Sequence, residues 1–173
     1  PLVKYFLFFV VALLALSFLF PPKPKIPSSK NPSFAVRSSD KIFFKNMRAY
    51  FYHMKPDKAG VFMLRNLKKL EDEPFQFLLL ENEVMDEWYI RAYWKDSSMV
   101  GLWWMNEQAI NIDTLNNEEQ WKFAYDFYTA LLNNNDLKYN SLDSSIGPVI
   151  LDEDQRNLYE TTLFDYFRII GLN

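Results

Sequence analysis

Hydrophobic and polar positions follow three different patterns along the chain, and each pattern predicts a different kind of element. Residues 5–20 form an uninterrupted apolar run with no charged side chain. Between residues 42 and 115, apolar residues recur with a period of two, which is typical of half-buried β-strands. After residue 117 they recur at helical spacing. This order predicts an apolar N-terminal segment followed by an α+β domain whose strands precede its helices.

The apolar run predicts a single transmembrane helix over residues 1–22. A helix over residues 5–20 is about 24 Å long, against a hydrocarbon core of roughly 30 Å, and a snorkelling Lys4 brings the segment to the lower limit for a span. Pro21 and Pro22 end the helix. The side chains expected to form the membrane anchor are Tyr5, Phe8, Phe9, Leu13, Leu14, Phe18 and Phe20. The side chains expected to contact lipid headgroups are Lys4, Lys23, Lys25 and Lys30.

A cleaved signal peptide is the alternative interpretation of this run, but no small-x-small cleavage site follows it. We therefore expect a retained anchor in a bacterial inner membrane, with a mitochondrial inner membrane as the alternative. Basic residues are more numerous after the run than before it, so the positive-inside rule favours a cytoplasmic domain. A short N-terminal tail before a large domain favours export instead, and both orientations stay open.

Residues 23–40 are rich in proline, serine and lysine and predict an extended, semi-rigid tether. The tether separates the membrane from a domain expected over residues 41–173. A segment of that length is sufficient for one compact domain with its own core.

Period-two segments separated by short polar turns predict an antiparallel meander of about six strands. The expected strands are Ile42–His53, Val61–Leu70, Phe75–Leu80, Trp88–Lys95, Met99–Met105 and Ala109–Leu115. Within the second of these, Leu64 alternates with Arg65. The third is apolar on both faces, so we expect it at the centre of the sheet.

Two C-terminal helices are expected to cover one face of this sheet. The first begins at Asn117 with acidic residues in its first turn, and the second begins near Asp152 and ends at Gly171. We expect a loop between them up to Pro148. The outline resembles the architecture of pleckstrin-homology-like barrels, although no sequence motif accompanies the resemblance.

The net charge of −3 conceals a strong asymmetry. Residues 21–70 carry 12 lysines and arginines against 2 acidic residues, whereas residues 71–173 carry 6 against 20. One interpretation is attraction of the basic part to anionic lipid headgroups. The other is that basic strands pair with acidic strands and helices of the same domain. Nucleic acid is not expected as a partner, because the whole chain is acidic and no binding motif accompanies the basic stretch.

The chain carries little that favours catalysis or cofactor binding. It has no cysteine, and its single histidine, His53, is not enough for a metal site. Its acidic clusters fall in expected turns and helix starts, where capping explains them. It has four glycines and no phosphate-binding motif. We therefore expect no catalytic residue, no metal, no cofactor and no small-molecule substrate; an enzyme that uses a close carboxylate pair is the least favoured alternative.

Aromatic side chains predict how the domain is used. Trp88 and Trp94 share one face of an expected strand, and Tyr89 and Tyr93 share the other. Because helices cover one sheet face, the opposite face presents tyrosine, tryptophan and arginine, the residue types that dominate interface energetics. The residues expected to contact a partner are Tyr89, Arg91, Tyr93 and Trp103.

Together these features favour a non-catalytic, single-pass accessory or scaffolding subunit of a larger membrane protein complex. Its expected partners are other membrane-protein subunits and the lipid bilayer. The alternative is a membrane-tethered recognition module that binds anionic lipid headgroups or a peptide through the basic early strands.

Overall fold

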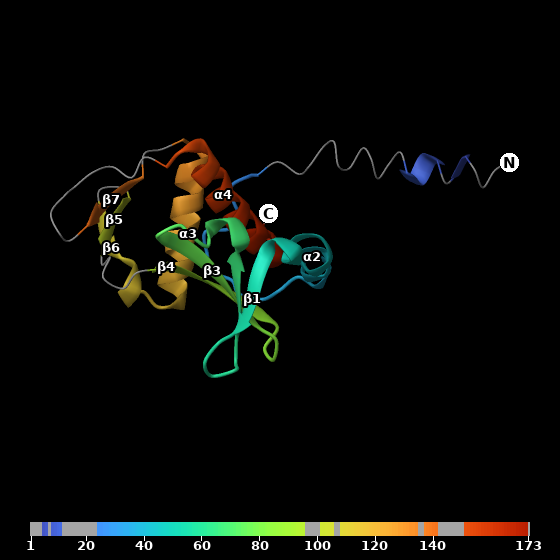
Figure 1. The fold of residues 1–173 in the computed structure, drawn as a ribbon, viewed down its shortest axis with the longest axis horizontal. Helices are drawn as coiled ribbons and strands as arrows, with labels where there is room; N and C mark the ends of the chain where they lie inside the picture. The colour runs from blue at the N-terminus through green and yellow to red at the C-terminus, as the bar shows by residue number, and fades with distance from the viewer. Residues whose placement is uncertain are drawn as a thin grey trace.

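The computed structural model describes residues 5–6, 8–11, 24–95, 101–105, 108–134, 137–141 and 151–172. Figure 1 shows strands gathered beside two long helices, with the C-terminus at the end of the second. The described part is an α+β domain with an antiparallel four-stranded sheet and C-terminal helices, as the order of hydrophobic patterns predicts.

The first half of the domain contains short helical turns and one sheet. Its elements are α2 (Ser38–Phe43), the π-helical turn η1 (Phe44–Arg48), the 3-10 turn η2 (Ala49–Phe51), β1 (Tyr52–Pro56), β2 (Met63–Leu67), the 3-10 turn η3 (Lys68–Leu70), β3 (Phe75–Asn82) and β4 (Glu87–Trp94). The four strands pair in the order β1-β2-β3-β4, each antiparallel to its neighbour.

The second half contains a smaller sheet and the two helices. Its elements are β5 (Gly101–Met105), β6 (Gln108–Asn111), the 3-10 turn η4 (Ile112–Thr114), α3 (Asn117–Leu132), β7 (Lys138–Ser141) and α4 (Glu153–Ile169). The three short strands pair in the order β6-β5-β7.

The prediction of a single six-stranded meander is wrong in two places. Ile42–His53 is helical as far as Phe51, and only its last two residues enter β1. Helical spacing prevails because Phe44 and Arg48, one turn apart, both face the domain: Phe44 is 1% exposed and Arg48 pairs with a carboxylate of α4. In addition, β5 and β6 form a separate sheet with β7, a short polar strand in the segment expected to be a loop.

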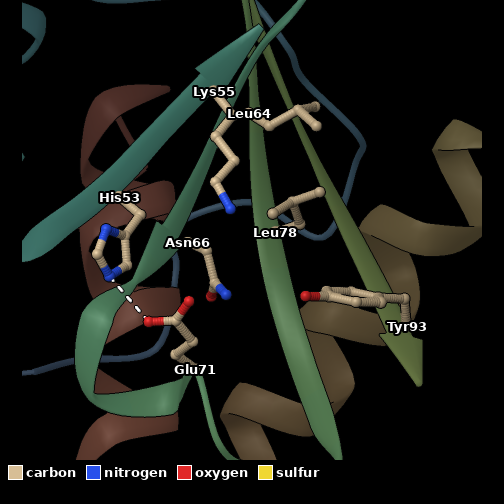
Figure 2. A pocket seen from close by; sticks show the side chains of 7 residues that line it. All are labelled: His53, Lys55, Leu64, Asn66, Glu71, Leu78 and Tyr93. Atoms are coloured by element: carbon tan, nitrogen blue, oxygen red, sulfur yellow. Dashed lines mark ion pairs between the residues drawn. The ribbon is translucent and has the colours of Figure 1, made fainter. Parts of the chain in front are cut away.

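The expected central position of the third strand is confirmed. β3 lies between β2 and β4, and seven of its eight residues are buried. On one face Leu79 pairs with Ile90 of β4, and both are almost inaccessible to water. On the other face Leu78 pairs with Asn66 of β2, and this side of the sheet is the one drawn in Figure 2.

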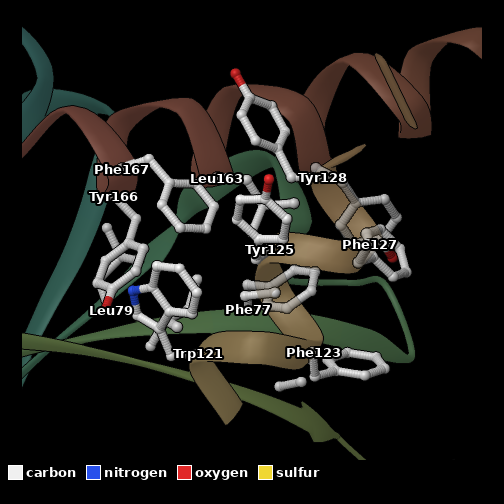
Figure 3. Close-up of a cluster of buried hydrophobic side chains, with 14 of the residues drawn as sticks. Phe77, Leu79, Trp121, Phe123, Tyr125, Phe127, Tyr128, Leu163, Tyr166 and Phe167 are labelled. Carbon is white, nitrogen blue, oxygen red and sulfur yellow. The ribbon is translucent and has the colours of Figure 1, made fainter. Parts of the chain in front are cut away.

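Helices α3 and α4 cover the first face and form the core with it. Figure 3 shows aromatic rings from both helices meeting Phe77 and Leu79 of β3. The Trp121 and Phe167 rings meet edge to face with centroids 5.7 Å apart, which joins α3 to α4. Both helices begin at a capping box, at Asn116 and Asp152 respectively.

The end of α4 is fixed by Gly171. This residue has φ +75°, a left-handed conformation that glycine adopts without strain, and the following N–H of Leu172 returns to the Phe167 carbonyl at 2.8 Å. The expected end of the second helix is therefore confirmed, together with its physical reason.

The segment that precedes α2 is extended and lies against the domain. The Ser28 N–H donates to the Leu172 carbonyl at 2.9 Å, and the Arg37 N–H donates to the Ile169 carbonyl at 3.0 Å. Between these two points the Trp88 N–H of β4 donates to the Phe34 carbonyl at 2.8 Å. The chain therefore contacts the domain well before α2, with Pro27 buried and Ser28 hydrogen-bonded to Leu172.

The predicted membrane anchor falls largely outside the described residues. Leu13, Leu14, Phe18 and Phe20, with Lys4 and Lys23, lie there. Tyr5, Phe8 and Phe9 are described, with helical backbone and side chains 76%, 75% and 60% exposed. Within the described ranges, no helix combines the length and the apolar character needed to cross a membrane. The anchor stays a prediction from sequence.

Candidate functional site

The face of the four-stranded sheet that α3 and α4 leave uncovered is the candidate site, and we call it the open face. Alternation along β4 separates the two faces: Trp88, Ile90, Ala92 and Trp94 are at most 8% exposed, whereas the residues between them are partly or fully exposed. The open face consists of His53, Lys55, Leu64, Asn66, Gln76, Leu78, Leu80, Tyr89, Arg91 and Tyr93.

The structure brings three of the four expected partner-contact residues together. Tyr89, Arg91 and Tyr93 follow one another along the open face of β4. Trp103 belongs to β5, which is part of the other sheet, and its backbone is therefore not on the surface that carries the other three.

Tyr89 is already engaged within the domain. Its ring stacks on Phe34 with centroids 4.7 Å apart and meets the edge of Phe62 at 5.9 Å. Its hydroxyl donates to the Glu87 carboxylate, which raises the pKa of Tyr89 to about 12. Arg91 is exposed and Tyr93 is half-buried. The surface available to a partner is therefore centred on Arg91 and Tyr93.

A hollow of about 270 Å³ opens beside Tyr93 (Figure 2). The residues that line it come from all four strands of the sheet and the turn after η3: His53, Lys55, Leu64, Asn66, Glu71, Leu78 and Tyr93. Pockets that hold drug-sized ligands or cofactors measure roughly 300–1,000 Å³, so this hollow lies just below that range. Its size suits one amino-acid side chain or a comparably small group.

Gln76, beneath the hollow, orients the polar groups of its wall. Its amide nitrogen donates to the carbonyls of Glu71 at 3.0 Å and Glu73 at 2.8 Å. The amide oxygen must then accept, and it receives the Asn66 amide N–H at 2.7 Å and the Tyr93 hydroxyl. Because its nitrogen is committed to Gln76, the Asn66 side chain leaves Oδ1 buried without a hydrogen-bond partner.

Some charged side chains around the hollow have a partner of opposite charge among the described residues, and others do not. His53 Nε2 lies 3.0 Å from a carboxylate oxygen of Glu71 (Figure 2). Lys55 is exposed and forms no ion pair with any described residue. Burial, and then the Glu71 carboxylate, raise the pKa of Tyr93, so this phenol stays neutral at physiological pH. The wall therefore offers the Lys55 ammonium, the amide oxygen of Asn66 and a neutral tyrosine hydroxyl around the apolar Leu64 and Leu78.

The basic segment contains side chains that pair within the domain and side chains that do not. Five of its basic side chains form ion pairs in the described part of the chain: Arg37 with Asp40, Lys41 with Asp86, Lys45 with Glu81 and Glu83, Arg48 with Asp165, and Arg65 with Glu81. Four others are exposed and form no ion pair in the described part of the chain: Lys55, Lys58, Lys68 and Lys69.

Lys68 lies beside a group of exposed apolar side chains, which we call the η1–β1 patch: Met47, Tyr50, Phe51 and Met54. Tyr50 is 81% exposed, and the Lys68 ammonium lies 4.6 Å from the centre of its ring. Lys25 and Lys30, which were expected at the headgroups, are exposed as well.

Several residues of the hollow were not singled out by the sequence. Lys55, Leu64, Asn66, Glu71 and Leu78 come together only through the register of β1, β2 and β3. The period-two pattern could have placed Leu64 and Asn66 on one face, but it does not say which face the helices leave open. Among the described residues, no group of three or more histidines and acids is placed to hold a metal ion.

Comparisons with protein-family models, curated proteins and solved structures found no match to this chain.

Proposed function

We propose that the protein is a non-catalytic, single-pass accessory or scaffolding subunit of a larger membrane protein complex. It contributes one transmembrane helix from residues 1–22 and an interaction domain that binds a neighbouring subunit through the open face. The observation that carries this proposal is the asymmetry of the four-stranded sheet. Helices close one face, while the other retains exposed Arg91, half-buried Tyr93 and a hollow with the free cation of Lys55.

The docked N-terminal segment supports a position close to the membrane. Seven residues separate Phe20, the last residue of the apolar run, from Ser28, which is bonded to Leu172. A proline-rich segment advances about 3.1 Å per residue, so these residues span about 22 Å when extended. The domain is then held beside the bilayer, within reach of neighbouring subunits. The proposed location is a bacterial inner membrane, or else a mitochondrial one.

The proposal is tested by extracting the tagged protein from its native membrane with a mild detergent, followed by size-exclusion chromatography and mass spectrometry. We expect a stoichiometric assembly of high mass. Arg91→Glu reverses an exposed charge on the open face and should reduce partner recovery at least fivefold. Lys122→Glu makes the same change on the exposed side of α3 and should leave recovery unchanged. A lone monomer from wild-type membranes would refute the proposal.

A second candidate function is a membrane-tethered recognition module for anionic lipid headgroups. The observation that favours it is the η1–β1 patch, whose exposed aromatic and methionine side chains lie beside the Lys68 ammonium in a lysine-rich part of the chain. Aromatic rings beside lysines are typical of surfaces that rest at a membrane interface, where each basic residue contributes about 1 kcal/mol.

Hydrogen–deuterium exchange of the full chain in nanodiscs tests this candidate. Exchange in residues 47–58 should slow when phosphatidylglycerol is added to phosphatidylcholine, and high salt should abolish the effect. The fourfold variant of Lys55, Lys58, Lys68 and Lys69 to glutamine should show no lipid dependence. Equal exchange in both lipid compositions would remove this candidate.

A further inference from the structure

The hollow on the open face has an apolar part whose size limits its occupant. Leu64 and Leu78 supply its hydrophobic surface, and about 270 Å³ is space for a single residue. An extended apolar groove would accept a helix or a long acyl chain, whereas this hollow is bounded by Glu71 and Tyr93. The occupant is therefore a short apolar group attached to something that lies outside.

Lys55 gives the hollow a preference for negative charge. His53 Nε2 and a carboxylate oxygen of Glu71, which share the same wall, lie 3.0 Å apart. The Lys55 ammonium is left without a carboxylate from the described chain, and Figure 2 shows its side chain pointing along the hollow toward Asn66. A carboxylate that entered here would gain a counter-ion without separating an existing pair.

Asn66 favours a ligand that donates a hydrogen bond. Gln76 is fixed by two backbone carbonyls, so the Asn66 amide cannot be turned round without losing its bond to Gln76. Its Oδ1 is buried and lacks a partner, which is a costly state for an amide oxygen. A ligand N–H that reached this oxygen would remove that cost. Tyr93 donates its proton to Gln76 and retains a lone pair to accept.

A short apolar group, a carboxylate and an adjacent N–H occur together in the last residue of a polypeptide. We propose that the hollow binds the carboxyl-terminal residue of a partner chain whose final side chain is aliphatic. The terminal carboxylate pairs with Lys55, the last peptide N–H donates to Asn66 Oδ1, and the side chain packs on Leu64 and Leu78. This assignment rests on the proposed function, because it names the part of the partner that the open face recognises.

Fluorescence anisotropy with the full chain in nanodiscs tests the assignment. The probe is a labelled pentapeptide of four alanines followed by leucine, with a free carboxyl terminus, and the matched probe carries a terminal amide. We expect the free acid to bind at least tenfold more tightly than the amide. Equal binding of the two probes, or binding of neither, overturns the proposal.

Two lysine variants distinguish specific binding in the hollow from non-specific attraction between surface lysines and the peptide carboxylate. Lys55→Gln should weaken binding of the free-acid peptide at least tenfold, whereas Lys58→Gln, in the adjoining turn and outside the lining, should change it less than twofold. Equal losses in both variants overturn the proposal. Octanoate, which has a carboxylate and an apolar chain but no N–H, should compete poorly. Displacement of the peptide by octanoate at equal concentration would contradict the role of Asn66.

The result of the peptide-binding experiment does not depend on the result of the co-purification experiment. A partner complex that depends on Arg91, together with no peptide binding, would overturn the carboxyl-terminal assignment and leave the proposed function in place. Carboxylate-dependent peptide binding by a protein that purifies alone would support the hollow as a site and refute the subunit proposal.

Discussion

Asp165 belongs to an ion pair in which the carboxylate is far more deeply buried than its cation. Its side chain is 1% exposed, while that of Arg48 is 27% exposed. Arg48 Nε lies 2.9 Å from both carboxylate oxygens, and the Tyr52 hydroxyl donates to one of them at 2.8 Å. Burial raises the pKa of Asp165, and the Arg48 guanidinium and the hydrogen bonds only partly oppose this shift.

Removing Arg48 should therefore cost more than removing Asp165. Arg48→Met leaves a buried carboxylate without its cation, and we expect a loss of about 3 kcal/mol in the free energy of unfolding at pH 7. Asp165→Asn should cost less, because Arg48 can turn toward water. Urea unfolding of the purified protein, followed by circular dichroism, measures both.

The same pair predicts a pH dependence. A raised pKa means that Asp165 contributes most to stability when protonated, below its unfolded pKa of about 3.9, and that this contribution is lost as pH rises through the folded pKa. Without Arg48 the folded pKa rises further. The loss caused by Arg48→Met should consequently shrink near pH 4. A loss of the same size at pH 4 and pH 7 would show that the ion pair is not its cause.

Arg65 shows that hydropathy alone does not predict which side chains of a strand face the core. The sequence correctly separates Leu64 from Arg65 on opposite faces of a strand, but hydropathy would send Leu64 inward. The structure places Arg65 on the helix-covered side, 5% exposed, with its guanidinium bonded to the buried carboxylate of Glu81 at 2.9 Å from Nε. Leu64 lies in the open hollow instead. A partner 16 residues away in β3 reverses the expected direction.

At the scale of elements, Gln120 joins α3 to the edge of β4. The Ala92 N–H donates to its side-chain oxygen at 2.8 Å, and its nitrogen donates to the Ile112 carbonyl of η4 at 2.8 Å. Gln120→Met should destabilise the protein by about 2 kcal/mol, because both backbone groups lose a buried partner. Lys122→Met, an exposed control on the same helix, should change stability by less than about 0.5 kcal/mol. Thermal unfolding compares the two, and equal midpoints would contradict the bridging role.

The extended segment before α2 behaves as an additional strand at the other end of β4. Ala35 bridges to Glu87, and Phe34 stacks on Tyr89. A chain that starts at residue 41 lacks these contacts, so we expect it to be about 2 kcal/mol less stable than one that starts at residue 24. Chemical denaturation of both fragments measures the difference. Equal stabilities would mean that the segment lies on the surface without contributing to the fold.

The elements that could be predicted from the sequence are those with an unambiguous local pattern. Helices α3 and α4 have capping residues and helical spacing, and β3 and β4 have clear apolar patterns. The stretch from Ile42 to Phe51 fits both periods, and only the distant Trp88 and Asp165 decide for the helix. β7 has four mostly polar residues, and its pairing with β5 depends on a strand that lies far back in the chain.

At the scale of the whole molecule, the candidate site was predictable only in part. Alternation along one strand was enough to place Tyr89, Arg91 and Tyr93 together. The hollow depends on the register of all four strands, on the position of the turn after η3 and on the orientation of Gln76, none of which a single sequence specifies. The charge asymmetry was visible, but which lysines stay unpaired depends on the folded positions of Glu81 and Asp165.

The central claim, that the open face contacts a neighbouring subunit, is tested most directly by photo-crosslinking in native membranes. A photoreactive amino acid is placed at position 91 on the open face or at position 122 on α3, both exposed in the domain. We expect position 91 to give one discrete adduct with a membrane protein and position 122 to give none. Adducts from position 122 but not from position 91, or no adduct from either, would contradict the account.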